Sequence, residues 1–173
     1  MTAFAAAVND AMRMLATDPR TVFVGQSVRY DGAAIYHSLD GVPMEKRVEF
    51  PVVENLQLGY CTGLSLTGKL PICIYPRMDF MLLAMDQLVN HLDKLPLYGW
   101  TPRVIIRTRV GQKTKDGVPM DAGPQHTQNY THAFRQMLTT VQVYQLRRAE
   151  DVMPAYELAL ASKRSTLIVE MPY

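Results

Sequence analysis

The sequence has few of the features that mark specialised classes of protein. It contains two cysteines and one tryptophan among 173 residues, and its 18 Lys and Arg residues exceed its 16 Asp and Glu residues by a charge of only +2. So small a surplus argues against a nucleic-acid or membrane partner. The apolar runs are also far shorter than the ~20 residues of a membrane-spanning helix. Cys61 and Cys73 lie in apolar runs without metal-type spacing, so we expect reduced thiols in the core.

Several motifs that carry chemistry are missing as well. The chain has no G-x-G-x-x-G and no G-x-x-x-x-G-K-[ST], and therefore lacks the usual phosphate-binding loops of nucleotide-binding proteins. No C-x-x-C pair is present, and the histidines form no H-E-x-x-H arrangement. His126 and His132 lie six residues apart, a weak pattern that is more often structural, so we predict no metal site. Ser65 lies within an expected helix and not on a nucleophile elbow, which argues against a hydrolase.

The length and the amino-terminal segment indicate a simple organisation. A chain of 173 residues suits one domain, and we see no repeat or linker that would divide 1–173. The first fifteen residues carry acidic and basic side chains at helical spacing, unlike a signal peptide. We therefore expect a single-domain cytoplasmic protein.

Alternating apolar strands and amphipathic helices predict an α/β fold. We expect a three-layer architecture in which an open, mainly parallel sheet carries helices on both faces. The strands are expected at 21–25, 47–53, 70–76, 103–110, 141–146 and 165–172, and the helices at 3–16, 55–68, 80–94, 130–140 and 150–162, with a short helix within 27–46. Asp79 is expected to cap the helix at 80–94. Arginines such as Arg77, Arg103 and Arg107 alternate with apolar residues and show no clustering along the chain.

Three features fall at the carboxyl ends of the predicted strands, where open α/β sheets bind their ligands. They are Glu54, the turn at 75–80, and a long polar loop that contains Gln125 and His126. Glu54 follows the apolar run FPVV, so its carboxylate is either a helix cap or a group that faces a ligand. Gly59 and Gly63 lie on one helix face, where we expect close backbone packing.

These residues carry a family resemblance. The run ENLQLGYCTGLSLTGKLPICIYPRMDFMLLAMDQLVN, residues 54–90, resembles the pyrimidine-binding domain of thiamine-diphosphate enzymes of the transketolase class. It is most similar to the beta subunits of the 2-oxoacid dehydrogenases. Weaker likeness extends upstream through VGQSVRYDGA and downstream through GPQHTQ to LIVE, so that the resemblance covers nearly the whole chain.

The resemblance implies roles for four residues. It implies that Glu54 hydrogen-bonds N1′ of the aminopyrimidine and thereby favours the 4′-imino tautomer, which removes the proton from C2 of the thiazolium ring. Phe80 would pack on the pyrimidine ring, with a core phenylalanine as the alternative. Val52 would line the same pocket or be a core strand residue. His126 would handle protons of the substrate or acyl intermediate, or simply be an exposed loop histidine. Gln26 stands where related subunits often have an acidic residue.

The resemblance also implies a partner. Such enzymes hold the cofactor's diphosphate and Mg²⁺ through a Gly-Asp-Gly motif in another domain, and this chain has no such motif. The diphosphate and metal would therefore belong to an alpha-type subunit, in a heterotetramer, and the substrate would be a 2-oxo acid or a ketose selected partly by the loop at 111–125.

Three functions are compatible with this resemblance. The first is the pyrimidine-binding subunit of a split thiamine-diphosphate enzyme that decarboxylates 2-oxo acids or transfers acyl or two-carbon units. The alternatives are the beta subunit of a conventional 2-oxoacid dehydrogenase and a non-catalytic scaffold that retains the fold. Beta subunits normally continue into a C-terminal domain, whereas this sequence stops after LIVEMPY, which favours the first function.

Overall fold

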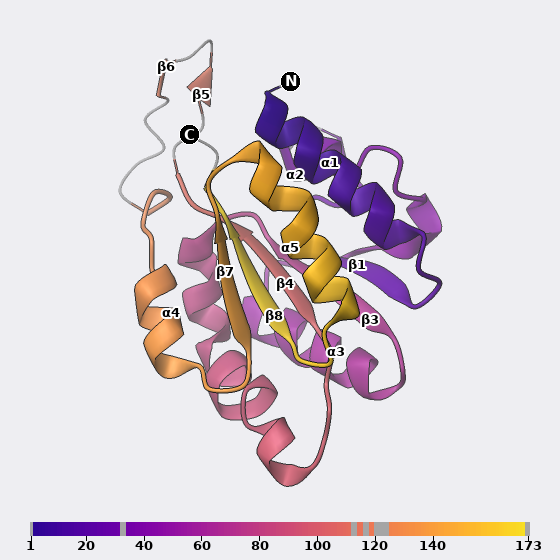
Figure 1. The fold of residues 1–173 in the computed structure, drawn as a ribbon, viewed down its shortest axis with the longest axis vertical. Helices are drawn as coiled ribbons and strands as arrows, with labels where there is room; N and C mark the ends of the chain where they lie inside the picture. The colour runs from indigo at the N-terminus through magenta and orange to yellow at the C-terminus, as the bar shows by residue number, and fades with distance from the viewer. Residues whose placement is uncertain (1, 32–33, 112–113, 116–117, 120–124, 172–173) are drawn as a thin grey trace.

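A six-stranded parallel sheet forms the centre of the molecule (Figure 1). The computed structural model describes residues 2–31, 34–111, 114–115, 118–119 and 125–171. The strand order is β2-β1-β3-β4-β8-β7, and every neighbouring pair in this sheet is parallel. The strands are β1 (Thr21–Gly25), β2 (Arg47–Glu49), β3 (Leu70–Tyr75), β4 (Ile105–Arg109), β7 (Gln142–Leu146) and β8 (Thr166–Glu170). A separate antiparallel pair consists of β5 (Thr114–Lys115) and β6 (Val118–Pro119).

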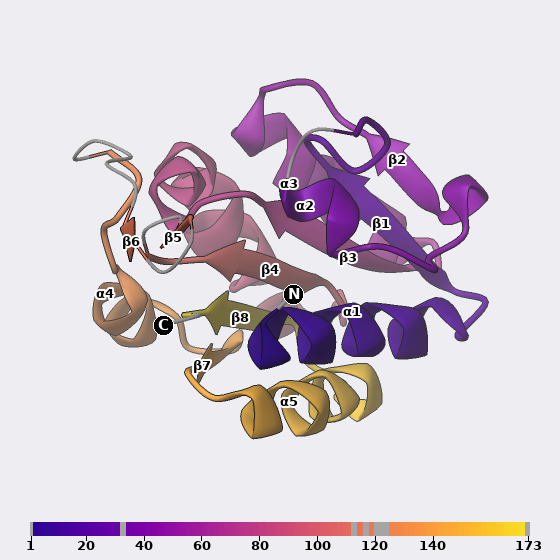
Figure 2. The same ribbon diagram turned by 90° about the horizontal axis from the view of Figure 1, so that it is seen from above.

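Helices cover both faces of the sheet, as the sequence predicts (Figure 2). One face carries α1 (Ala3–Ala16), α2 (Ala34–His37) and α5 (Ala149–Ala161), with α1 and α5 packed side by side. The other face carries α3 (Glu54–Leu66), the 3-10 helix η2 (Met78–Ala84), the π-helix η3 (Asp86–Leu92) and α4 (Thr131–Met137). Two further 3-10 helices are η1 (Met44–Lys46) and η4 (Leu95–Tyr98).

The strands are almost continuously apolar because both of their faces are buried. Side chains alternate between the faces with a period of two. In β3, Ile72 and Ile74 belong to the core beneath α1 and α5, whereas Cys73 and Tyr75 belong to the core beneath α3. Cys61 and Cys73 are both free and buried, which confirms the expectation of reduced core thiols.

Helix α1 has the bounds that the sequence predicts. The Oγ1 of Thr2 accepts a hydrogen bond from the backbone N–H of Ala5 at 3.2 Å and so satisfies one of the free N–H groups of the first turn. The helix ends at Ala16, before the sequence Thr-Asp-Pro-Arg. Among the described residues, no helix is long and apolar enough to cross a membrane.

Two segments differ from the prediction. The strand expected at 47–53 ends at Glu49, because its partner β1 ends opposite it at Gly25 and the chain then turns at Ser27, which has a φ of 57°. Val52 lies in the following loop with 75% of its surface exposed, so its interpretation as a core strand residue is wrong.

The helix expected at 80–94 is wound as a 3-10 helix followed by a π-helix. Asp79 does not cap it: the capping position is Arg77, which makes no side-chain capping bond. Both carboxylate oxygens of Asp79 are instead buried without a hydrogen-bond partner among the described residues. The expected cap is therefore absent from this helix.

Candidate functional site

Glu54 is the first residue of α3, and its side chain turns inward. The residue is 4% exposed, and its Oε1 accepts a hydrogen bond from Nε2 of Gln26 at 3.3 Å. Val53, which precedes it at the capping position, makes no side-chain capping bond. Glu54 thus lies one position inside the helix, where its negative charge faces the positive end of the helix dipole.

A buried tyrosine fixes the backbone at Glu54. The hydroxyl of Tyr75, at the carboxyl end of β3, donates to the carbonyl oxygen of Glu54 at 2.9 Å. Burial, reinforced by Cys73, Cys61 and Glu54 itself, raises the pKa of Tyr75 far above its ordinary value. The hydroxyl therefore stays protonated and remains a hydrogen-bond donor. This bond ties the start of α3 to the sheet.

The loop that carries Gln26 is held by Glu49, the last residue of β2. The carboxylate of Glu49 accepts hydrogen bonds from three consecutive backbone N–H groups, those of Ser27 at 2.6 Å, Val28 at 2.8 Å and Arg29 at 2.9 Å. Ser27 has a φ of 57°, a left-handed conformation that is uncommon outside glycine. The three bonds stabilise this turn and so position Gln26 beside Glu54. Neither Glu49 nor this role of Gln26 is evident in the sequence, because the contacts join neighbouring strands.

Phe80 and His126 come together from distant parts of the chain. Their ring centroids are 5.6 Å apart and the ring planes meet at 89°, an edge-to-face contact. Phe80 lies in η2, directly after β3, and His126 lies after the segment 120–124, which is outside the described residues. Both side chains are partly exposed.

These groups share one edge of the sheet. Glu54 follows β2, Gln26 follows β1 and Phe80 follows β3, and these three strands are neighbours. Helix α3 packs against η2 and η3, and a Cβ on Gly59 would lie 3.2 Å from Oε1 of Gln87. The arrangement offers a buried carboxylate, a flat aromatic ring and an imidazole, which are groups that can hydrogen-bond and stack on a heteroaromatic ligand.

The expectation of close packing holds for one of the two glycines of α3. Gly59 lies against Gln87, whereas a Cβ on Gly63 would meet no atom of the described residues within 4 Å. A glycine in a helix costs about 1 kcal/mol relative to alanine. No contact in the described part of the chain explains Gly63.

Comparison with known sequences identifies the relatives of the chain. No protein-family model matches it. It is 25% identical over 169 residues to the mitochondrial beta subunit of the pyruvate dehydrogenase E1 component of Chaetomium thermophilum, covering 95% of this chain and 43% of that protein. It is 26% identical over 171 residues to the corresponding subunit of Cyanidium caldarium, covering 97% of this chain and 50% of that protein. The chain is thus similar to pyruvate dehydrogenase E1 beta subunits over almost its whole length. It spans about half the length of these relatives.

Solved structures share the fold. A split-gene transketolase, described as an inactive beta4 tetramer, superposes with a TM-score of 0.72 at 18% identity, covering 95% of this chain and 49% of that one. Transketolase from Leishmania mexicana gives 0.71 at 18% identity, covering 95% and 24%. A thiamine-diphosphate-dependent 4-hydroxybenzoylformate decarboxylase from Rhodococcus jostii gives 0.67 at 17% identity, covering 96% and 30%. The resemblance to a transketolase-like pyrimidine domain is confirmed.

Proposed function

We propose that the chain is the pyrimidine-binding subunit of a split thiamine-diphosphate enzyme that decarboxylates a 2-oxo acid or transfers an acyl or two-carbon unit. The observation that carries the proposal is the buried carboxylate of Glu54, held by Gln26 at the ligand-binding edge of a transketolase-like sheet. The similarity to pyruvate dehydrogenase E1 beta subunits supports the same function.

The described residues fit the aminopyrimidine half of the cofactor. Glu54, buried at the start of α3, would hydrogen-bond N1′ and share a proton with it. Phe80 would present its ring to the pyrimidine, and Val52, exposed in the loop before α3, would contact it from the side. Bound thiamine diphosphate would supply a carbon nucleophile for attack on the substrate carbonyl.

His126 would exchange protons with the substrate and not with the cofactor. Its ring packs edge-to-face with that of Phe80, which would place the imidazole beside the pyrimidine and toward the open end of the site. From there it could donate a proton to an oxygen of the substrate or remove one.

An exposed apolar face next to this site supports a partner subunit. Large apolar side chains at the start of α3 and in η2 remain 40–75% exposed, namely Val52, Val53, Leu56, Tyr60, Leu82 and Leu83. Apolar groups gathered in this way are typical of an interaction surface. Gly63, which has free space above it, lies on the exposed part of the same helix. We infer that an alpha-type subunit covers this face, contributes the site for the diphosphate and Mg²⁺, and forms a heterotetramer with this chain.

The beta subunit of a conventional 2-oxoacid dehydrogenase is a second candidate, favoured by the names of the sequence relatives. The two candidates differ in the fate of the acyl group. A dehydrogenase subunit would pass it to a lipoyl-bearing acyltransferase, whereas a carboligase or decarboxylase would release it or join it to a second carbonyl compound. Product analysis of the reconstituted complex, with and without a lipoyl domain, separates them.

Exchange of the C2 proton of the cofactor tests the role of Glu54. In the complex with the partner subunit, Glu54→Gln should slow this exchange by about 10²–10⁴-fold, the usual effect of losing a positioned acid–base group. Glu45→Gln, the same change at an exposed residue of η1, is the matched control and should leave exchange unchanged. Exchange at the wild-type rate in Glu54→Gln would rule out the proposed role.

A further inference from the structure

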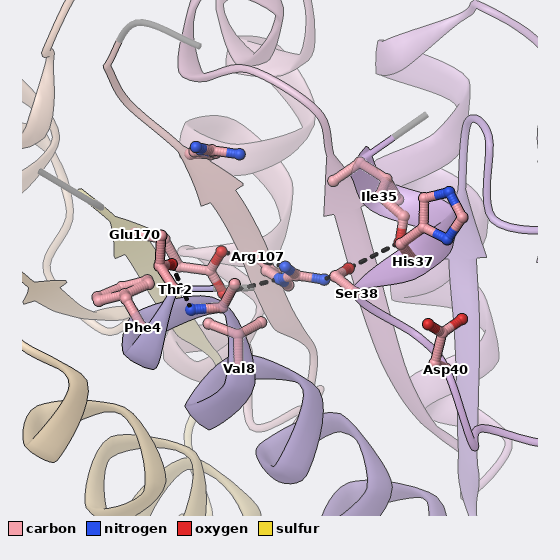
Figure 3. Close-up of a pocket in the computed structure, with 11 residues that line it drawn as sticks. Thr2, Phe4, Val8, Ile35, His37, Ser38, Asp40, Arg107 and Glu170 are labelled. Carbon is pink, nitrogen blue, oxygen red and sulfur yellow. Dashed lines mark hydrogen bonds and ion pairs between the residues drawn. The ribbon is translucent and has the colours of Figure 1, made fainter. Parts of the chain in front are cut away.

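A cavity lies on the face of the sheet that carries α1, α2 and α5 (Figure 3), whereas Glu54 begins α3 on the other face. Its volume is about 450 Å³, within the range of about 300–1,000 Å³ that is typical of small-molecule sites. It opens at the carboxyl ends of β4 and β8, between the first turns of α1 and the helix α2. The function proposed above makes no use of it.

Arg107 forms a fixed wall of this cavity. Its guanidinium is buried and donates to both carboxylate oxygens of Glu170, at 2.8 and 3.1 Å. Its Nη1 donates to Oγ of Ser38 at 2.7 Å, and the hydroxyl of Tyr156 donates to Glu170 at 2.7 Å. Glu170 therefore neutralises the charge of Arg107. Glu170 of β8 and Ser38, which follows α2, fix the orientation of the guanidinium, and Tyr156 of α5 in turn holds Glu170.

Arg109, two residues further along β4, lines the same cavity, and its register partner on β8 is Glu170. Its Nε is buried and has no hydrogen-bond partner among the described residues. Burial and repulsion from Arg77 and Arg107 lower the pKa of Arg109, and the charge of Glu170 opposes this shift only in part. Arg77 is itself bound to the backbone, donating to the carbonyl oxygen of Gly111 at 3.1 Å. Three guanidinium groups thus gather around the single carboxylate of Glu170, although the sequence shows no cluster of arginines.

The rest of the wall is mainly apolar. Phe4, Val8 and Ile35 line the cavity and belong to the core beneath α1 and α5. The first turn of α1 contains no acidic residue, so the positive end of its dipole adds to the charge of the arginines. Asp40 also lines the cavity, at the end away from Glu170 (Figure 3).

We propose that this cavity binds a small organic carboxylate with an apolar tail. The carboxylate would accept hydrogen bonds from the guanidinium of Arg109, and the tail would lie against Phe4, Val8 and Ile35. A planar carboxylate matches the two-pronged geometry of a guanidinium, and its charge would balance the excess of three guanidinium groups over the carboxylate of Glu170 at this end of the cavity. The apolar wall selects for a hydrocarbon tail over a hydrated inorganic anion.

Titration of the chain alone with hexanoate, followed by amide NMR shifts, tests the proposal. We expect saturable shifts around residues 2–8, 35–40 and 107–109. Each methylene added from butanoate to hexanoate should tighten binding by about fourfold. Hexanamide, which has the same shape without the charge, and inorganic phosphate, which lacks the tail, should bind at least tenfold more weakly. The measurement uses no thiamine diphosphate, so its outcome is independent of the function proposed above.

Two variants assign the binding to Arg109. Arg109→Gln should weaken hexanoate binding at least tenfold while leaving the amide spectrum outside the cavity unchanged. Arg135→Gln removes the same charge from an exposed position of α4 and should bind hexanoate as the wild type does. Equal binding of hexanoate and hexanamide, equal binding of hexanoate and phosphate, unchanged binding by Arg109→Gln, or no saturable shifts at millimolar hexanoate would each overturn the proposal.

Discussion

Nε2 of Gln26 lies 3.3 Å from Oε1 of Glu54, so a neutral amide donates to the carboxylate that we place against the cofactor. Glu49 holds the loop of Gln26 through three backbone bonds, which makes the donor part of a fixed framework. Because Gln26 carries no charge, it hydrogen-bonds the carboxylate of Glu54 without neutralising or repelling it. A second carboxylate at this position would compete with Glu54 for a proton.

The first prediction concerns this pair. In Gln26→Glu the two carboxylates would repel each other, so one of them should keep its proton in the folded chain and have a raised pKa. The free energy of unfolding of the variant should then fall, relative to that of the wild type, as the pH rises above about 4.3, the ordinary pKa of glutamate. Urea denaturation across this range measures the effect. Gln136→Glu, which adds the same charge at an exposed position of α4, should show no such pH dependence, and a flat difference for Gln26→Glu would mean that the two groups do not interact.

Asp79 is the subject of the second prediction. Both of its carboxylate oxygens are buried without a partner among the described residues, which costs folding free energy. Asp79→Asn keeps the shape and removes the charge, and should raise the free energy of unfolding of the isolated chain by about 1–3 kcal/mol. Glu157→Gln, at an exposed position of α5, controls for the change in net charge. Destabilisation by Asp79→Asn would instead reveal a partner for the carboxylate.

The third prediction concerns acid stability. Burial opposes the ionisation of Asp93, but hydrogen bonds from Lys94, from the backbone N–H groups of Val141 and Thr140, and from Thr139 outweigh it and hold its pKa well below the ordinary value. Because the folded-state pKa is depressed, this stabilisation is present above about pH 3.9, the ordinary pKa of aspartate, and is lost as the pH falls below it. Asp93→Asn should cost about 3 kcal/mol at neutral pH.

Denaturation curves of Asp93→Asn and the wild type should therefore converge as the pH is lowered. A difference of constant size from neutral to acidic pH would show that the ionised form of Asp93 is not what stabilises the fold.

The fourth prediction concerns the aromatic contact. If the ring of Phe80 packs on the pyrimidine, Phe80→Leu should weaken cofactor binding to the assembled enzyme by about five- to tenfold, since the leucine lacks the flat face. Phe80→Tyr keeps that face and should bind nearly as tightly as the wild type. Calorimetric titration with thiamine diphosphate and Mg²⁺ distinguishes these outcomes. Equal losses in both variants would point to a purely structural phenylalanine.

The fifth prediction concerns the division of the cofactor site. The isolated chain should bind thiamine diphosphate only weakly, because it has no Gly-Asp-Gly motif for the diphosphate and metal. Tight, Mg²⁺-dependent binding by the 173-residue chain alone would contradict a split site. The measurement needs no knowledge of the substrate.

Much of the fold could be predicted because it depends on local patterns. Helix α1 has the predicted bounds, since its apolar spacing and the Thr-Asp-Pro-Arg stop are both local signals. The winding of residues 78–92 could not be predicted, because 3-10, α and π turns all place apolar side chains on one side over so short a segment. The early end of β2 could not be predicted either, because it depends on where the neighbouring strand β1 ends.

Some features of the candidate site could also be predicted from the sequence, and others could not. Glu54, Phe80, Val52 and His126 were selected through spacing that matches a family pattern, and the structure brings Phe80 and His126 into contact. Their functional roles stay predictions. The bonds from the loop of Gln26 to Glu49 join different strands, and the pair of Arg107 and Glu170 spans 63 residues of sequence. Contacts of this kind depend on strand order, which periodicity alone does not determine.

That strand order has a consequence for how the chain folds as it is made. β8 follows the other five strands of this sheet in the sequence, yet it lies between β4 and β7. Until its residues leave the ribosome, β4 exposes an unpaired edge, β7 has no neighbour in the sheet, and Arg107 has no counter-ion. An exposed edge is a site of aggregation, and pairing between distant segments is slow. The nascent protein therefore completes its sheet only when residues 166–170 insert into the gap, so its yield should depend on the protection of that gap by chaperones during synthesis.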